Sequence, residues 1–203
     1  MTAKTFTARD GRKIVLRPLR EPDIEPLFLF ASKIAREKKR NPELGIVSLD
    51  RPVTRADERK FLAKTLKGSK DGDVVSVAAF AGQALVGNCD ITRRPFRDEL
   101  HTGVLGIVIV EDYRGIGLGG ALIREALASA KVKGIWLVEL EVFSINESAR
   151  RLYRRLGFKE FGVLPEKVIR GGRRIDSVYM FARLDGNRYN AGRPSKSRWC
   201  SRS

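Results

Sequence analysis

Residues 105–120, LGIVIVEDYRGIGLGG, join a short apolar run to a glycine-rich turn, a combination that can bind phosphate. The β-branched and apolar residues at 104–110 predict a buried strand. Four glycines follow it, Gly115, Gly117, Gly119 and Gly120. Glycines at a strand-to-helix turn let backbone N–H groups converge at the positive end of the helix dipole. The stretch therefore predicts a diphosphate site, and the alternative is a tight turn that binds nothing.

The same glycines also fit the G-x-G-x-x-G pattern of a dinucleotide-binding turn. Glu139 or Glu141 would then be the acid that binds a ribose on the next strand. Two features oppose this interpretation. Four residues, two of them acidic, separate the strand from the first glycine, and the chain lacks the repeated strand-helix alternation of a doubly wound sheet. The dinucleotide hypothesis is therefore the minor one.

Length and composition predict one globular domain. The chain has 203 residues, of which 42% are hydrophobic and 32% charged. We expect an enzyme-like domain at residues 1–185 and a basic, flexible tail at 186–203. No apolar run has the length of a membrane span, and the N-terminal residues lack the apolar core of a signal peptide, so the expected location is cytoplasmic. Cys89 and Cys200 do not form a disulfide framework, and a single histidine argues against a metal site.

The net charge of +16 is high for a domain of this size. Five of these charges lie in the tail after Asp185, and further basic clusters occur at 33–40, 150–155 and 170–174. One explanation of this charge is that it lies on solvated helix faces. The functional alternatives are attraction to a phosphate-rich cofactor and attraction to nucleic acid or the ribosome. No nucleic-acid-binding motif accompanies the charge, and a homodimer stays open.

The expected elements place the glycine turn at the centre of a mixed sheet. In order they are a strand at 13–16, helices starting at Asp23 and Thr54, strands at 74–80, 85–91 and 104–110, a helix at 118–133, a strand at 135–143, a helix after Asn146, and a hairpin within 158–182. One helix between two strands makes a parallel crossover. The predicted fold class is α/β, a single domain with one central parallel βαβ crossover flanked by helices.

Two separate motifs resemble the Gcn5-related N-acetyltransferase (GNAT) superfamily. Its turn motif, Gln or Arg followed by x-x-G-x-G/A, is matched by Arg114, Gly117 and Gly119. Its helix motif, N-x-x-A-x-x-L-Y-x-x-x-G-F, is matched by Asn146, Ala149, Leu152, Tyr153, Gly157 and Phe158. The resemblance covers roughly residues 12–184, and the tail lies outside it.

The resemblance implies acetyl-CoA as co-substrate and an amine as acceptor. In such a fold the two central parallel strands splay apart and the cofactor enters between them. Backbone groups of three strand residues would hold the pantetheine arm and thioester: Val108, Ile109 and Val110. Amides of the turn would bind the diphosphate: Arg114, Gly115, Ile116, Gly117, Leu118, Gly119 and Gly120. Asn146 would both cap its helix and touch the cofactor.

Acetyl transfer requires a neutral amine and a protonated leaving thiolate. The resemblance implies Tyr153 as the general acid for the thiolate. It also implies Glu141 as the base, since Glu141 precedes Asn146 by five residues on the strand that edges the cleft. Strand alternation puts Glu139 on the same face, so Glu139 is the rival.

The acceptor is less determined by the sequence. The segment VIRGGRRIDSVYM resembles the branch of the family that acetylates free amino acids and small amines, whereas the position of Glu141 resembles enzymes that act on protein N-termini. A non-catalytic acyl-CoA-binding or ribosome-associated module is the alternative function.

Overall fold

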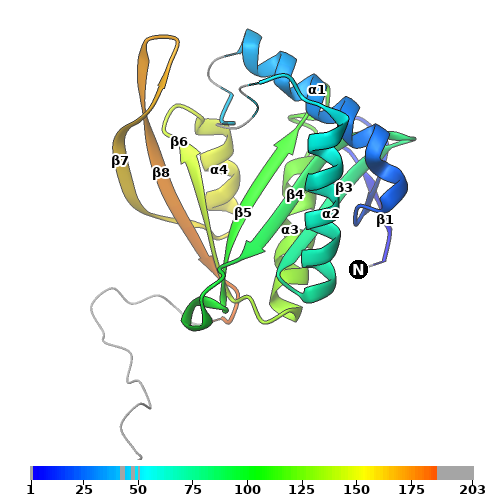
Figure 1. Cartoon of the computed structure of the whole chain (residues 1–203). Helices are drawn as coiled ribbons and strands as arrows, with labels where there is room; N and C mark the ends of the chain where they lie inside the picture. The colour runs from blue at the N-terminus through cyan, green and yellow to red at the C-terminus, as the bar shows by residue number, and fades with distance from the viewer. Residues whose placement is uncertain (1, 42–43, 47–48, 50, 187–203) are drawn as a thin grey trace, which may run out of the picture.

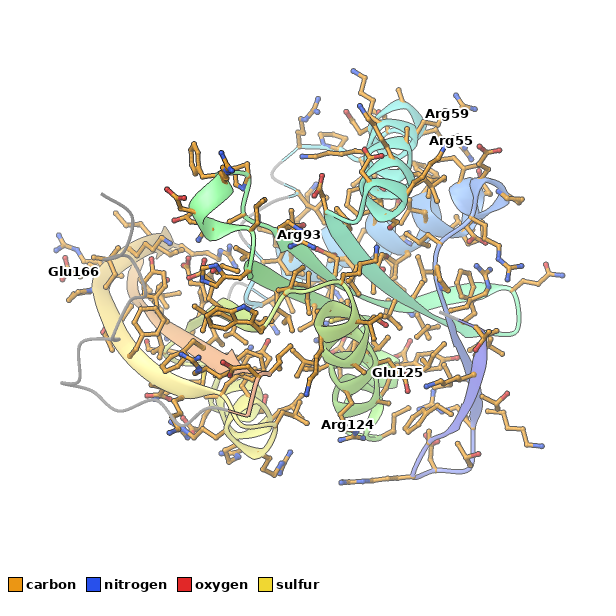
Figure 2. The ribbon with its side chains drawn as sticks, turned by 90° about the horizontal axis from the view of Figure 1, so that it is seen from below. Arg55, Arg59, Arg93, Arg124, Glu125 and Glu166 are labelled. Carbon is orange, nitrogen blue, oxygen red and sulfur yellow. The ribbon has the colours of Figure 1, made fainter. Side chains whose placement is uncertain are left out.

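An eight-stranded mixed sheet lies between two layers of helices in the computed structural model, which describes residues 2–41, 44–46, 49 and 51–186 (Figure 1). The strand order is β1-β2-β3-β4-β5-β6-β8-β7. Helices α1 and α2 cover one face and α3 and α4 the other (Figure 2). The elements are β1 Lys4–Thr7, β2 Lys13–Arg17, α1 Ile24–Arg40, α2 Arg55–Asp71, β3 Val74–Ala81, β4 Ala84–Arg93, β5 Thr102–Ile109, α3 Leu118–Val132, β6 Leu137–Phe143, α4 Glu147–Arg155, β7 Lys159–Arg170 and β8 Arg173–Arg183.

The N-terminal hairpin contains a strand that the sequence did not predict. β1 pairs antiparallel with β2, with Thr5 opposite Val15. The strand has four residues, KTFT, and they are mostly polar and exposed, so no alternation marks it. Pairing with β2 places Phe6, Thr7 and Arg9 next to the glycine turn, where Arg9 N–H donates to Ile116 O at 3.1 Å.

The first two helices differ from prediction in their details. Asp23 precedes α1 as expected, but its carboxylate does not cap the helix; it binds the Arg17 guanidinium at two distances of 2.7 Å and accepts the Arg20 N–H. Thr54 caps α2 as predicted, accepting the Asp57 N–H at 3.2 Å. α2 continues to Asp71 and ends at Gly72 with φ of +89°. Phe61 of α2 is 41% exposed and lies outside the core.

The central crossover is confirmed, and it contains the feature that makes the site. β5, α3 and β6 form the predicted βαβ unit with parallel strands. The two strands pair over only three residue pairs, the last being Val104 with Glu139. Beyond that pair they diverge (Figure 1), while β5 stays paired with β4 up to Ile109. Every other strand pair in the described sheet is antiparallel, which excludes the doubly wound fold.

One hydrophobic core holds both layers to the sheet. Fully buried side chains of α3, such as Leu122 and Ile123, pack on the central strands, and Ile34 of α1 packs on the opposite face. The predicted α/β mixed sheet is confirmed. None of the described helices is long and apolar enough to span a membrane. The predicted tail begins at Gly186, and its residues 187–203, Cys200 among them, lie outside the described residues.

Candidate functional site

The divergence of β5 and β6 opens a cleft of about 920 Å³. Its walls come from β5, β6, the glycine turn, the first turn of α3 and helix α4. The N-terminal hairpin and residues 44–46 also line it. Arg170 of the β7–β8 hairpin donates to Leu44 O at 2.5 Å and to Ile46 O at 2.7 Å. Segments that are distant in sequence therefore meet around one opening.

The edge of β5 toward this cleft has backbone groups without a strand partner. Pairing with β6 stops at Val104, and residues 105–109 line the cleft. In an antiparallel ladder only alternate residues bond to a given neighbour, so every second N–H and C=O of this segment points away from β4 into the gap. An extended ligand with amide groups can add to this edge as a strand would.

The glycine turn directs N–H groups toward the same cleft. Gly115 and Gly117 have φ values of +74° and +91°, which a residue with a Cβ rarely adopts. Gly117 is the N-cap of α3, and the first helical bond runs from Ala121 N–H to Gly117 O at 3.3 Å. The N–H groups of residues 118–120 precede that bond and lie at the positive end of the helix dipole. This arrangement suits a diphosphate.

Gly119 allows the turn to lie close to α4. A Cβ at Gly119 would stand 3.1 Å from Leu152 Cδ2 and 3.5 Å from Ile109 Cδ1. Leu152 and Ile109 both line the cleft, so the turn packs directly against its walls. A side chain at this position would therefore push α4 away from α3 or fill the space beside the helix start.

Arg114 lines the cleft, but its side chain is bound within the protein, where it supports the turn. Its Nε donates to Ile109 O at 2.8 Å, and its two terminal nitrogens bind the Glu37 carboxylate, with Nη2 to Oε2 at 2.9 Å. The Glu37 side chain is only 3% exposed. The Arg114 N–H donates to Glu111 O, so this predicted diphosphate amide is used within the turn.

Most of the predicted cofactor residues line the cleft: Val108, Ile109, Arg114, Gly115, Ile116, Gly117, Gly119, Gly120, Asn146 and Tyr153. Val110 and Leu118 do not. Val110 is buried in the core and its N–H donates to Val86 O, and the Leu118 side chain is also in the core, so Leu118 offers only its backbone. Asn146 caps α4 as predicted, accepting the Ala149 N–H at 3.2 Å.

Tyr153 projects from α4 into the cleft and is 7% exposed. Its ring packs against Phe158 at a centroid distance of 5.8 Å. In the described part of the chain no residue forms a hydrogen bond with its hydroxyl. Burial raises the pKa of Tyr153 well above its ordinary value, so the phenol keeps its proton and is free to donate it across one hydrogen bond.

Glu141 and Glu139 lie on one face of β6 but in different surroundings. Glu141 lines the cleft, and its carboxylate binds the Lys167 ammonium, which also donates to Tyr179 Oη at 2.8 Å. Burial raises the pKa of Glu141, but the ion pair with Lys167 outweighs it and the net shift is downward. Glu139 stands where β5 and β6 are still paired and is bound by Arg94. Only Glu141 is therefore beside the gap.

Four arginines of the cleft were missed by the sequence analysis: Arg9, Arg124, Arg151 and Arg155. None forms an ion pair with another residue that the structure describes. Figure 2 shows Arg124 on the side of α3 away from α1 and α2, and its Nη1 lies 3.3 Å from a Cβ built on Gly120. Arg151 and Arg155 belong to a basic run visible in the sequence, but only the fold shows that they face the same cleft as Arg9.

Replacing Arg124 with glutamine should weaken phosphate binding near the turn. A charge-assisted hydrogen bond contributes roughly 1.5–3 kcal/mol, so we expect the Kd for acetyl-CoA to rise about tenfold or more, with less difference at high salt. Calorimetric titration with acetyl-CoA at two ionic strengths measures the Kd and its dependence on salt. Lys131→Gln, an exposed change on the same helix outside the cleft, is the matched control; equal effects of both variants would contradict a local role for Arg124.

Comparisons with known proteins agree with this geometry. The model of the acetyltransferase (GNAT) family matches residues 42–158. An L-methionine sulfoximine/L-methionine sulfone acetyltransferase of Pseudomonas paraeruginosa is 32% identical over 95 residues, which are 47% of this chain and 55% of that protein. The N-alpha-acetyltransferase RimI of Mycobacterium tuberculosis is 40% identical over 91 residues, 43% of this chain and 53% of that protein. The chain thus spans about half the length of these curated relatives.

The fold has a similar neighbour among solved structures. The crystal structure of an acetyltransferase of the GNAT family from Streptococcus pneumoniae superposes with a TM-score of 0.73 and is 27% identical in sequence. The superposition covers 84% of this chain and 99% of that one. Nearly the whole architecture of that neighbour is therefore present here.

Proposed function

The chain belongs to the acetyltransferase (GNAT) family, and we propose that it transfers the acetyl group of acetyl-CoA to a primary amine. The observation that carries the proposal is the cleft between β5 and β6, where a free strand edge leads to the N–H-rich start of α3. Acetyl-CoA has its groups in the matching order, with a thioester, an amide-containing pantetheine arm and a diphosphate. The relatives' names, an amino-acid-type acetyltransferase and an N-alpha-acetyltransferase, support the same activity.

The residues of the cleft fit acetyl-CoA along its length. The backbone at Val108 and Ile109 would hold the pantetheine amides, and the N–H groups of residues 115–120 would bind the diphosphate. The cleft arginines that form no ion pair with a described residue would bind the remaining phosphate charge. Acetyl-CoA supplies the activated acetyl group; the chain orients it and handles the protons.

Tyr153 and Glu141 are the groups that would handle those protons. Tyr153, whose hydroxyl binds no residue that the structure describes and keeps its proton at neutral pH, would protonate the leaving thiolate. Glu141 is the candidate base because it lines the gap, whereas Glu139 lies below it in the paired part of the sheet. The two groups come from opposite faces: Tyr153 from α4, and Glu141 from the face that α4 does not cover.

The acceptor is an amine on a small molecule or on a peptide N-terminus. The two relatives named above divide in the same way. Arg170 joins the β7–β8 hairpin to residues 44–46, which line the cleft, and this connection favours a small amine as acceptor. The cytoplasmic location, a homodimer and contact of the basic surface or tail with nucleic acid or the ribosome stay predictions from the sequence.

Titration of the protein with acetyl-CoA and, in parallel, with NADH tests the cofactor. We expect binding of acetyl-CoA alone. An acceptor panel of free amino acids, including methionine sulfone, and short peptides with free N-termini then tests transfer through release of the CoA thiol. Failure to bind acetyl-CoA would make the glycine turn structural and end the proposal. Binding without transfer to any amine would instead favour the non-catalytic acyl-CoA-binding module.

A further inference from the structure

Asp90 of β4 is a second carboxylate at the level of Glu141. Asp90 pairs with Gly106 across the β4–β5 ladder. The last parallel pair of β5 and β6 is Val104 with Glu139, so the same register carried two residues further sets Glu141 across the gap from Gly106. Residues that are directly opposite in a ladder share a face. Asp90 and Glu141 therefore lie on one face of the sheet, separated by Gly106 and the opening.

Gly106 puts no side chain between the two carboxylates. It is exposed and lines the cleft. A Cβ at Gly106 would stand 3.5 Å from Asp90 Oδ2, so this oxygen borders the space that a side chain would fill. This face is the one opposite α3 and α4. A Cβ at Gly87 of β4 would meet Leu122 of α3, and Asp90, three residues further along the same strand, points to the other face because side chains alternate.

A short polar chain holds the Asp90 carboxyl in place. Asn88 Nδ2 donates to Asp90 Oδ1 at 3.0 Å, and Ser76 Oγ donates to Asn88 Oδ1 at 3.3 Å. Asn88 and Ser76 are buried, while Asp90 is half-buried. Oδ2 accepts no hydrogen bond from any residue of the described chain, and Asp90 forms no ion pair with one. One oxygen is thus fixed and the other is available.

Most other charged groups near this face already have a partner, and two further titratable groups, Glu58 and Cys89, have pKa values raised by burial. Arg94 binds Glu139 and Lys167 binds Glu141 on β6. On α1, which packs on β4, Glu37 is bound by Arg114. On α2, which packs on β3, burial raises the pKa of Glu58 to about 6. The neighbouring Cys89 is in the core, where burial raises the pKa of its thiol.

We propose that Asp90 accepts the proton of the acceptor's ammonium group, while Glu141, which is bound by Lys167, holds that ammonium by charge. The inference rests on the proposed acetyl transfer and divides between two carboxylates the work assigned there to one. The acceptor it implies is a primary amine that arrives protonated. The amine would enter over Gly106, on the face opposite Tyr153.

The proton and electron balance of the step is complete with these groups. The ammonium gives one proton to Asp90 Oδ2, and the neutral nitrogen forms a bond to the thioester carbonyl carbon. The C–S bond breaks with its electron pair on sulfur, and Tyr153 protonates the sulfur. The second proton lost by the nitrogen restores Tyr153, and Asp90 releases its proton to water. The net products are the N-acetyl amine, the CoA thiol and one proton.

The protonation behaviour of the two carboxyls suits this division. Burial raises the pKa of Asp90 to about 6, against the hydrogen bond from Asn88, which lowers it. A carboxyl with that pKa is ionised above pH 6 and is a stronger base than an ordinary one. As the pH falls through about 6, Asp90 becomes protonated and kcat should fall. The lowered pKa of Glu141 places its own protonation below that range.

Asp90→Asn tests the proposal in the full-length protein, with Asp98→Asn as the matched control at an exposed position. We expect kcat for an alkylamine acceptor to fall on the order of 10²-fold, with the Kd for acetyl-CoA unchanged. The limb of the pH–kcat profile near pH 6, where kcat falls as Asp90 is protonated, should also be lost. A weakly basic acceptor, such as a hydrazide that is already neutral at the assay pH, should lose far less. Gly106→Val, which fills the space but keeps Asp90, should raise the KM for the amine and tests the site if Asp90→Asn does not fold.

Several results would overturn the proposal. Full alkylamine activity of Asp90→Asn would do so, as would an equal loss with both kinds of acceptor. A limb near pH 6 that vanishes in Glu58→Gln and persists in Asp90→Asn would assign the limb to Glu58. If the unsubstituted protein acetylates no amine, the proposed function itself fails and Asp90 with it; if it does and Asp90→Asn is normal, only the inference about Asp90 fails.

Discussion

Replacing Tyr153 with phenylalanine should lower kcat by roughly 10²–10³-fold while the Kd for acetyl-CoA stays within about twofold, because general acid catalysis typically contributes 10²–10⁴-fold. The substitution removes only the hydroxyl. The ring remains packed against Phe158, and no hydrogen bond with a described residue is lost, since the hydroxyl has none. Burial keeps the phenol protonated at neutral pH, so the effect should persist across that range. Steady-state kinetics with calorimetric titration measures both quantities.

Tyr113→Phe is the control for Tyr153→Phe. Tyr113 lies in the turn before Arg114, with its ring beneath the Arg12 guanidinium at 4.2 Å, and it does not line the cleft. Its substitution should leave kcat unchanged. An unchanged kcat for Tyr153→Phe would remove Tyr153 from the mechanism. A loss of acetyl-CoA binding of the same size as the loss of kcat would make its role structural.

Replacing Arg114 with methionine should reduce the free energy of unfolding by roughly 3 kcal/mol. The change leaves the Glu37 carboxylate, which is 3% exposed, without its cation, and a buried charge that loses its partner costs about 3–5 kcal/mol. We take the lower end because the Arg114 side chain is 35% exposed and part of the pair is screened by water. The bond from Arg114 Nε to Ile109 O is lost as well, so the turn should bind acetyl-CoA less tightly. Urea unfolding measures the stability.

The pair of Arg40 with Glu111 offers a matched contrast, since it also joins α1 to the turn. Its side chains are 72% and 59% exposed, so Arg40→Met should cost less than about 1 kcal/mol. The double variant Glu37→Leu with Arg114→Met should recover part of the stability lost in Arg114→Met, because no buried charge is left unpaired. Equal effects of Arg114→Met and Arg40→Met on the free energy of unfolding would show that burial of Glu37 does not determine how much its pair with Arg114 stabilises the protein.

The sequence by itself determined the elements whose cause is local. The glycine turn could be predicted because residues at positive φ, such as Gly115 and Gly117, favour glycine over other types. The Thr54 and Asn146 caps could be predicted because a cap needs a particular side chain within three residues of its N–H partner. The crossover of β5, α3 and β6 followed from one helix between two strands. These features gave the fold class and most of the residues that line the cleft.

The tertiary structure decided what depends on register and on contacts between distant segments. No local pattern indicates that β5 and β6 separate after Val104, since the separation is a property of the pair and not of either strand. The pairing of Arg114 with Glu37 joins residues 77 positions apart, and it explains why that arginine supports the turn and does not point at a ligand. Asp90 and Glu141 share a face only because β4 pairs Asp90 with Gly106, and the β5–β6 register, extended two residues beyond its last pair, sets Glu141 opposite Gly106. Chain order alone does not determine such distances, because they depend on how the whole sheet packs.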